Sequence, residues 1–369
     1  LKTALGKLND EFVELRRQCG EAENRTFFEK EARTGLNRVI GRVSGPMEEW
    51  LTEHREGTAH DLILALYFEL RAYLRVAERY DDHYVTQAAA FGTDVRISQL
   101  CLDPSVFLDQ SFSSGRGAVL FSATLSPMDY YRDILGCTEA RCAALPSPFP
   151  TENLGLFCAA DVSTRYKDRQ QSIEPVARYL YEMCRCRTGN YMAFFPSYSY
   201  LTQVLERFEE LFPEVRTLVQ QPGMDEQARR EFLDTFQPDA TETLLGFSVM
   251  GGVFGEGVDL AGERLIGTAI VGVGLPQVNP RQEILRDYFE ESRGSCFAYA
   301  YQYPGFNKVL QAAGRVIRTP KDKGVVLLID SRFGWAEYRQ LFPSHWAHCR
   351  WLYGPAQLAD QLKGFWETV

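Results

Sequence analysis

Residues 311–318 read QAAGRVIR and place an amide and two guanidiniums in one short apolar stretch. In a helix, with about 100° between successive residues, Gln311, Arg315 and Arg318 would fall within an arc of about 60°. Gly314 lies beside them and costs about 1 kcal/mol of helix stability relative to alanine, which favours a position that a backbone or a ligand approaches closely. Arginine donates hydrogen bonds in pairs and keeps its charge, so this face suits a phosphate. The alternative interpretation is a pair of surface salt bridges.

A second candidate site is the glycine-rich segment MGGVFGEGVDLAG at 250–262. Its glycines allow positive φ angles and give a ligand access to backbone N–H groups. These glycines are Gly251, Gly252, Gly255, Gly257 and Gly262. Glu256 and Asp259 lie within the same segment, where fixed carboxylates would orient a phosphate, a sugar or a water. The alternative is a flexible loop with solvated acids.

Two further polar clusters follow segments with the composition of strands. Ser122, Ala123 and Thr124 follow GAVLF, and the segment FPSYS follows NYMAF. In the second cluster, Ser197 carries a hydroxyl and Tyr198 an aromatic ring, on which a base stacks for about 1–3 kcal/mol. Ordinary packing of the Tyr198 ring is the alternative.

The elements that position these clusters alternate between strand and helix from about residue 150 onward. Candidate strands are 153–160, 190–195, 215–220, 243–249, 265–273 and 324–330. Candidate helices are 168–186, 198–212, 224–236, 279–292 and 302–318, and the last must end before Pro320. Apolar strands that alternate with helices predict a parallel sheet covered on both faces. Ligands of such sheets bind beyond the carboxyl ends of the strands, where the polar clusters lie.

The first part of the chain has a different pattern. Residues 1–85 are predicted to be all-helical, because apolar residues recur there at helical spacing. In the first helix these residues are Leu1, Leu5, Leu8, Phe12 and Leu15. Strand-like composition begins near residue 86, with candidate strands at 95–103 and 117–125.

The bulk composition limits the function further. A chain of 369 residues favours two or more domains, and no apolar run approaches the roughly 20 residues that span a bilayer. The net charge of −9 argues against a protein that coats nucleic acid, so a nucleic-acid site should be a local groove. The nine cysteines lack zinc-ligand spacing, which predicts reduced thiols and no metal site. We expect a cytoplasmic protein without a signal peptide or membrane contact, and a piece of a longer one because residue 1 is leucine.

In chain order, the segments SATL, FFPSY, GGVFGEGVDL and QAAGRVIR resemble motifs III, IV, V and VI of superfamily 2 helicases of the XPD/DinG branch. The resemblance covers about residues 90–335. It implies an α/β fold with a RecA-like parallel-sheet motor domain and an arch-like helical segment at 1–85. Residues 86–130 would supply the C-terminal strands of the first RecA-like domain, and 131–369 would form the second RecA-like domain.

The resemblance also implies roles for the candidate residues. The arginine fingers that reach ATP would be Arg315 and Arg318, supported by Gln311. Nucleotide-binding residues would be Glu256, Asp259 and Gly314, and the two acids would couple the nucleotide to the strand. Coupling between the two motor domains would fall to Ser122, Ala123 and Thr124. The residues against the DNA backbone would be Ser197, Tyr198, Gly251 and Gly252.

Helicases of this branch are ATP-dependent enzymes that move 5′→3′ on single-stranded DNA and act in DNA repair. The resemblance therefore implies single-stranded or forked DNA and ATP as partners of a monomer. The chain has no G-x-x-x-x-G-K-[ST] loop and no acidic box, so ATP and Mg²⁺ would be held mainly by sequence upstream, where the iron–sulfur cysteines of the family also belong. We expect the chain alone to be inactive as an ATPase. The alternatives are a nucleic-acid-binding or regulatory module, and a generic α/β enzyme with a nucleotide or sugar-phosphate site.

Overall fold

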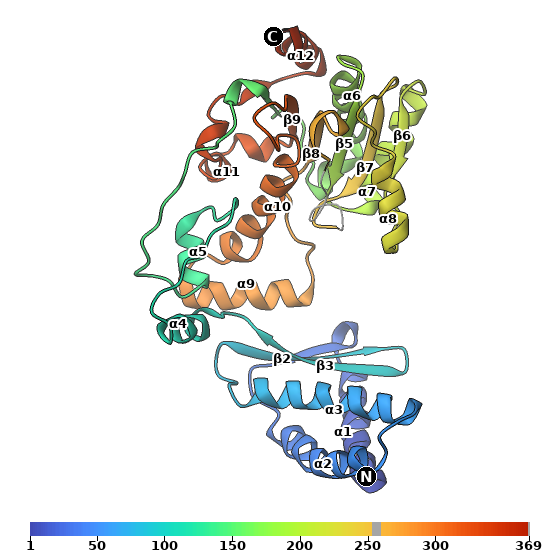
Figure 1. Ribbon diagram of the computed structural model, residues 1–369, viewed down its shortest axis with the longest axis vertical. Coiled ribbons are helices and arrows are strands. Elements are labelled where there is room, and N and C mark those ends of the chain that lie inside the picture. The colour runs from blue at the N-terminus through green and yellow to red at the C-terminus, as the bar shows by residue number, and fades with distance from the viewer. Residues whose placement is uncertain (253–259, 368–369) are drawn as a thin grey trace. The chain divides into compact units, whose positions relative to one another are not determined.

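The computed structural model describes residues 1–252 and 260–367, and the chain divides into two compact units. Unit 1 consists of Leu1–Ala118 and Asp133–Thr138, and unit 2 consists of Val119–Arg132 and Glu139–Val369. Figure 1 shows the helices and strands of each. Each unit buries apolar side chains of its own.

Unit 1 packs helices against a small antiparallel sheet. The helices are α1 (Lys2–Glu21), α2 (Thr34–Glu53), α3 (Thr58–Ala77) and α4 (Ser105–Ser113). The sheet consists of β1 (Thr26–Glu29), β2 (Tyr84–Phe91) and β3 (Asp94–Cys101), in that order. The apolar stripe predicted on α1 buries Leu8 and Leu15, in one cluster with Ile40 and Met47 of α2 and Leu70 of α3.

The structure differs from the sequence prediction over the first 130 residues. Residues 1–85 are not all-helical, because β1 lies within them; four residues are too few to show a periodic pattern. The strand predicted at 95–103 is formed as β3, but it pairs antiparallel with β2 in the sheet of unit 1.

The strand predicted at 117–125 is not formed. Its side chains lie in solvent, with Val119 87% and Phe121 90% exposed. A strand needs a neighbour for its N–H and C=O groups, and the described residues place none beside this segment. The assignment of 86–130 to a first motor domain stays a prediction.

Within the described residues, unit 2 is built on a parallel sheet of seven strands in the order β10-β4-β9-β8-β5-β7-β6. The strands are β4 (Leu154–Ala159), β5 (Asn190–Phe195), β6 (Arg216–Val219), β7 (Leu244–Val249), β8 (Gly267–Val271), β9 (Gly324–Ile329) and β10 (Arg350–Leu352). Every neighbouring pair is parallel, so all the carboxyl ends lie at one edge of the sheet. This confirms the predicted α/β class and its RecA-like parallel sheet.

Helices cover both faces of this sheet (Figure 1). One face is covered by α6 (Arg169–Arg185), α7 (Tyr198–Leu211) and α12 (Pro355–Glu367), and the other by α8 (Glu226–Asp234), α10 (Tyr303–Ala313) and α11 (Ala336–Arg339). The remaining helices are α5 (Met128–Ile134) and α9 (Pro280–Arg293). A π-helix, Ala298–Gln302, leads directly into α10. The six strands and five helices predicted between 150 and 335 are present with ends within two residues, except that α10 ends five residues early. The sequence analysis missed β10 and α12.

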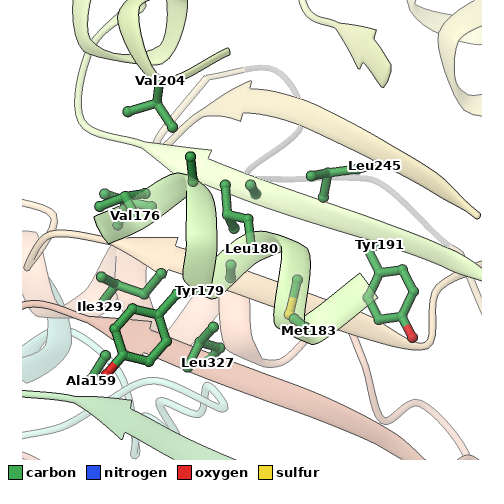
Figure 2. Close-up of a cluster of buried hydrophobic side chains, with 14 of the residues drawn as sticks. Ala159, Val176, Tyr179, Leu180, Met183, Tyr191, Val204, Leu245, Leu327 and Ile329 are labelled. Atoms are coloured by element: carbon green, nitrogen blue, oxygen red, sulfur yellow. The ribbon is translucent and has the colours of Figure 1, made fainter. Parts of the chain in front are cut away.

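The two cores of unit 2 follow from the alternation of side chains along the strands. On β5, Tyr191 and Phe195 belong to the cluster that includes α6, α7 and α12, whereas Met192 and Phe194 belong to the cluster that includes α8 and α10. Successive Cβ atoms of a strand point to opposite faces, so an unbroken apolar strand fills both cores. Figure 2 shows the first cluster, in which Leu180 of α6 lies among the strand side chains.

Helix α10 approaches the sheet backbone to backbone. Gly274 follows β8 with a φ of +72°, and a Cβ at this position would lie 2.2 Å from the carbonyl oxygen of Gly305 on α10. A Cβ on Gly305 would lie 3.0 Å from the carbonyl carbon of Gly274. The two glycines therefore fix α10 beside the carboxyl end of β8.

We predict that Gly274→Ala destabilises unit 2 by about 2–5 kcal/mol, because the methyl group would occupy a strained φ and overlap the Gly305 carbonyl. Urea denaturation of the variant measures the loss. The matched control is Gly354→Ala, where a Cβ meets nothing within 4 Å. Equal stability of the two variants would contradict the backbone contact.

Candidate functional site

The FPSY segment and the glycine-rich segment begin at neighbouring points of the sheet edge. Strands β5 and β7 are paired, with Phe195 opposite Val249. The N–H of Met250 donates to the carbonyl oxygen of Phe195 over 2.8 Å. Residues 196–198 and 251–252 therefore leave adjacent strands side by side, as the sequence analysis expected of carboxyl-end loops.

A buried amide that the sequence analysis missed connects these two segments. Gln220 follows β6 and is 4% exposed. Its Nε2 donates to the hydroxyl of Tyr198 over 3.0 Å, and its Oε1 accepts from the N–H of Val249 over 2.9 Å. A Cβ at Gly252 would lie 3.3 Å from the same Nε2, so the glycine leaves room for the amide. The sequence feature that could have indicated Gln220 is its position as a polar residue directly after an apolar strand.

Ser197 and Tyr198 already have structural contacts. Ser197 is the N-cap of α7, and its Oγ accepts from the N–H of Tyr200 over 3.4 Å. The Tyr198 hydroxyl is bonded to Gln220, and the side chain is half-buried. The Tyr198 hydroxyl therefore has a partner within the protein, and a role of either residue against DNA stays a prediction.

A lysine on α10 faces the start of the glycine-rich segment. Gly251 has a φ of +69°, and a Cβ on it would lie 3.1 Å from Cε and 3.5 Å from Nζ of Lys308. Burial lowers the pKa of Lys308. Lys308 precedes Gln311 by about one helical turn, so α10 presents an ammonium as well as an amide near this segment. The sequence analysis missed Lys308, because a single lysine in a helix ordinarily reads as a solvated side chain.

The prediction that Gln311, Arg315 and Arg318 share one helical face is wrong. Helix α10 ends at Ala313, with Gly314 as its C-cap. The N–H of Gly314 still donates to Leu310, but the following N–H groups make shorter-range or non-helical hydrogen bonds. Glycine disfavours a continued helix, and the proline at 320 forbids one. The two arginines therefore lie in the turn that follows α10.

This turn is organised by the carboxylate of Asp322, which is 9% exposed. Its Oδ2 accepts from the N–H of Arg318 over 2.7 Å and from the N–H of Thr319 over 2.8 Å, and its Oδ1 accepts from the Thr319 hydroxyl over 2.7 Å. The N–H of Gly262, at the end of the glycine-rich segment, also donates to it. Burial acts to raise the pKa of Asp322, but these hydrogen bonds outweigh it and hold the pKa below its ordinary value. One carboxylate thus joins the exit of the glycine-rich segment to the arginine turn.

A buried valine anchors the same turn to the sheet. Val316 is 1% exposed, and its Cγ1 would lie 2.3 Å from a Cβ on Gly324, the first residue of β9. Arg315, which is half-buried, and Arg318, which is exposed, flank this anchor. Their backbone positions are therefore set by the packing of Val316 and by Asp322.

The remaining predicted residues are less closely connected. The hydrogen bonds that the structure shows for Ser122 and Thr124 lie within 122–126: the N–H of Thr124 donates to Ser122 Oγ over 3.2 Å, and Ala123 lies between them. Among the described residues, no hydrogen bond joins Ser122 or Thr124 to the loops at the sheet edge. Glu256 and Asp259, with Gly255 and Gly257, lie outside the described residues.

Comparison with known proteins connects this arrangement to a family. Residues 180–349, which contain the FPSY segment, the glycine-rich segment and the arginine turn, match the helicase C-terminal domain family. The resemblance to helicases of the XPD/DinG branch is thereby confirmed. Three of the four segments that carried the resemblance lie within this match, and the fourth, SATL at 122–125, precedes it.

Curated relatives are similar to the chain at low identity. The ATP-dependent DNA helicase CHL1 of Coccidioides immitis is 26% identical over 297 residues, covering 68% of this chain and 34% of the relative. The general transcription and DNA repair factor IIH helicase subunit XPD of Schizosaccharomyces pombe is 25% identical over 274 residues, covering 66% of this chain and 33% of the relative. The chain therefore spans about a third of the length of these relatives.

Solved structures of XPD proteins are similar in fold to most of the chain, including parts of both units. Xpd4 of S. tokodaii has a TM-score of 0.60 at 13% identity, covering 94% of this chain and 66% of that one. A solved XPD helicase has a TM-score of 0.57 at 17% identity, covering 94% of this chain and 62% of that one.

Two further properties concern membranes and metals. In the ranges 1–252 and 260–367, no helix is both long and apolar enough to cross a bilayer. The same residues contain no group of three or more histidine, cysteine or acidic side chains arranged for a metal ion, and all nine cysteines are free thiols.

We predict that Asp322→Asn lowers the free energy of unfolding by about 2 kcal/mol at neutral pH, because a neutral amide accepts these N–H hydrogen bonds more weakly than a carboxylate. The pKa of Asp322 is lower in the folded state, so its contribution is complete above the unfolded-state pKa and is lost as the pH falls through the folded-state pKa. Urea denaturation at several pH values should show wild type and variant converging in acid. The control is Asp360→Asn, an exposed position on α12; a pH-independent gap at position 322 would refute the assignment.

Proposed function

We propose that this chain is the C-terminal part of an ATP-dependent DNA helicase that couples ATP hydrolysis to 5′→3′ translocation on single-stranded DNA. The main support is the connection that Asp322 makes between the arginine turn and the end of the glycine-rich segment, at the edge of the parallel sheet where β8 and β9 begin. The match of residues 180–349 to helicase C-terminal domains supports the same class of activity. The names of the relatives, which describe ATP-dependent DNA helicases and a DNA repair helicase subunit, favour DNA as the substrate.

In the proposed motor, the chain supplies half of the ATP site. Arg315 and Arg318 would stabilise the charge that spreads over the γ-phosphate during transfer, and Gln311 and Gly314 would lie beside them. Glu256 and Asp259 would link the nucleotide to the strand. ATP and Mg²⁺ would be held mainly by a preceding P-loop domain, to which residues 86–130, with Ser122, Ala123 and Thr124, would contribute. Residues 1–85 would form an arch-like insertion, and residues 131–369 would form the second motor domain.

The proposed DNA contacts lie on the loops after β5 and β7. Ser197, Tyr198, Gly251 and Gly252 would follow the backbone of single-stranded or forked DNA, with backbone N–H groups as donors. Gln220 positions both loops at once, so a shift in one segment would be passed to the other. The protein would act as a monomer, because one chain with two motor domains completes the ATP site.

In the full-length protein, we predict that Arg315→Ala lowers DNA-stimulated ATP turnover by about 10³-fold or more, because the transition-state charge loses its guanidinium. Steady-state phosphate release with and without single-stranded DNA measures this. The matched control is Arg230→Ala, which removes an exposed helical ion pair with Glu226 on α8 and should leave turnover unchanged. An Arg315→Ala variant that turns ATP over at the wild-type rate would contradict the proposed role of Arg315 as an arginine finger.

We predict that the 369-residue chain alone does not hydrolyse ATP, because it lacks the residues that hold the triphosphate and Mg²⁺. The same phosphate-release assay tests this prediction at high protein concentration. Mg²⁺-dependent turnover that Arg315→Ala abolishes would show that the chain holds a complete site. DNA binding by a full-length protein that never hydrolyses ATP would instead support the binding-module alternative.

A further inference from the structure

A short turn after β4 concentrates positive charge in an otherwise acidic chain. The segment STRYKDR at 163–169 contains three cationic side chains, Arg165, Lys167 and Arg169, against one carboxylate. That carboxylate, Asp168, accepts from the hydroxyl of Ser163 over 2.7 Å. Because the chain has a net charge of −9, this local excess is the opposite of the overall balance.

The two arginines of the turn are held by aromatic rings. The Arg165 guanidinium lies 4.5 Å from the ring centroid of Trp335, and the Arg169 guanidinium lies 5.5 Å from Tyr166 and 5.2 Å from Tyr200. In the part of the chain that the structure describes, neither arginine forms an ion pair, and Arg169 Nε has no hydrogen-bond partner. A guanidinium that rests on a ring keeps its N–H edge available for an anion.

Two of these rings are open to solvent. Tyr166 is 87% exposed and Trp335 is 40% exposed. Large aromatic side chains beside guanidiniums are the combination that binds single-stranded nucleic acid, because bases stack on the rings and phosphates pair with the cations. Both features therefore lie on one short stretch of surface.

A buried network makes this surface rigid. The hydroxyl of Thr164 donates to the carboxylate of Asp330, which is fully buried after β9. Arg332 donates to both oxygens of that carboxylate, over 2.9 and 2.8 Å, so the charges of Arg332 and Asp330 neutralise each other. The N–H of Ser331 donates to the carbonyl oxygen of Val162 over 2.7 Å. The turns after β4 and β9 are thus locked together, and Arg165 and Trp335 come from one turn each.

The surface continues into the loop after β5. A Cβ on Gly272, after β8, would lie 3.1 Å from Thr164 Oγ1 and 3.9 Å from Cγ of Pro196. The ring under Arg169, Tyr200, belongs to the first turn of α7, and its hydroxyl is 2.6 Å from Ser172 Oγ. The turn of Arg165 and Arg169 therefore adjoins the segment that is proposed to contact DNA.

We propose that Arg165, Tyr166, Arg169 and Trp335 form a second contact site for single-stranded DNA. Bases stack on the rings of Tyr166 and Trp335, and the two guanidiniums bind the adjoining phosphates. The site extends the strand path from the loop after β5 across the carboxyl ends of β4 and β9. This inference rests on the proposed function, because it requires a DNA strand at the same edge of the sheet.

The test is the affinity of the 369-residue chain for fluorescein-labelled oligo-dT, measured by fluorescence anisotropy at low salt. Tyr166→Ala should weaken binding about fivefold or more, because a stacked base is lost, whereas Tyr166→Phe keeps the ring and should bind within about twofold of wild type. Tyr166 is exposed, so neither substitution disturbs the fold. Arg165→Ala should weaken binding and reduce the slope of log affinity against log salt by about one, and Arg230→Ala is the control.

The outcomes separate this inference from the proposed function. If Tyr166→Ala and Arg165→Ala bind oligo-dT as tightly as wild type does while Tyr198→Ala binds it more weakly, the second contact site is refuted. The loop after β5 then remains the proposed DNA-binding site. If the wild-type chain does not bind oligo-dT at low salt, both are overturned. Photocrosslinking with 5-iododeoxyuridine gives an independent readout: adducts on Tyr166 or Trp335 support the site, and adducts confined to other aromatic residues oppose it.

Discussion

The carboxylate of Asp322 is the interaction on which the candidate half-site depends. It accepts hydrogen bonds from N–H groups on both sides of the site, at Gly262 and at Arg318 and Thr319. A buried carboxylate is stable only when such donors surround it, so the arginine turn and the end of the glycine-rich segment have to remain together. The structure thereby ties the arginine turn to the end of the segment whose first residues are proposed to contact DNA.

The parallel sheet supplies the frame for this connection. Its seven strands, within the described residues, present all their carboxyl ends at one edge, and loops from distant parts of the chain meet there. A backbone contact and a side-chain bridge then fix the spacing: Gly274 against Gly305 sets the approach of α10, and the Gln220 amide bridges the loops after β5 and β7. The net charge of −9 is compatible with DNA binding, because Arg165, Arg169 and Lys308 lie beside the loops at this edge.

Much of unit 2 could be predicted from the sequence, because its strands are continuous apolar runs and its helices have clear periodicity. The end of α10 could not be predicted, because the apolar pattern continues through Val316 and Ile317 although the helix ends before Gly314. The role of Asp322 could not be predicted either, because its position in the sequence does not show that N–H groups from two separate segments donate to it. The segment 117–125 has the composition of a strand, yet composition does not provide the neighbouring strand that pairing requires.

The most direct test of the central claim is a crystal structure of the full-length protein with Mg²⁺, a γ-phosphate analogue of ATP and single-stranded DNA. We expect the guanidinium of Arg315 or Arg318 to lie within about 3 Å of a γ-phosphate oxygen. We also expect Asp322 still to accept from Gly262 and Arg318 in that state. Two guanidiniums paired with protein carboxylates and turned away from the nucleotide would contradict the proposed role of the arginines.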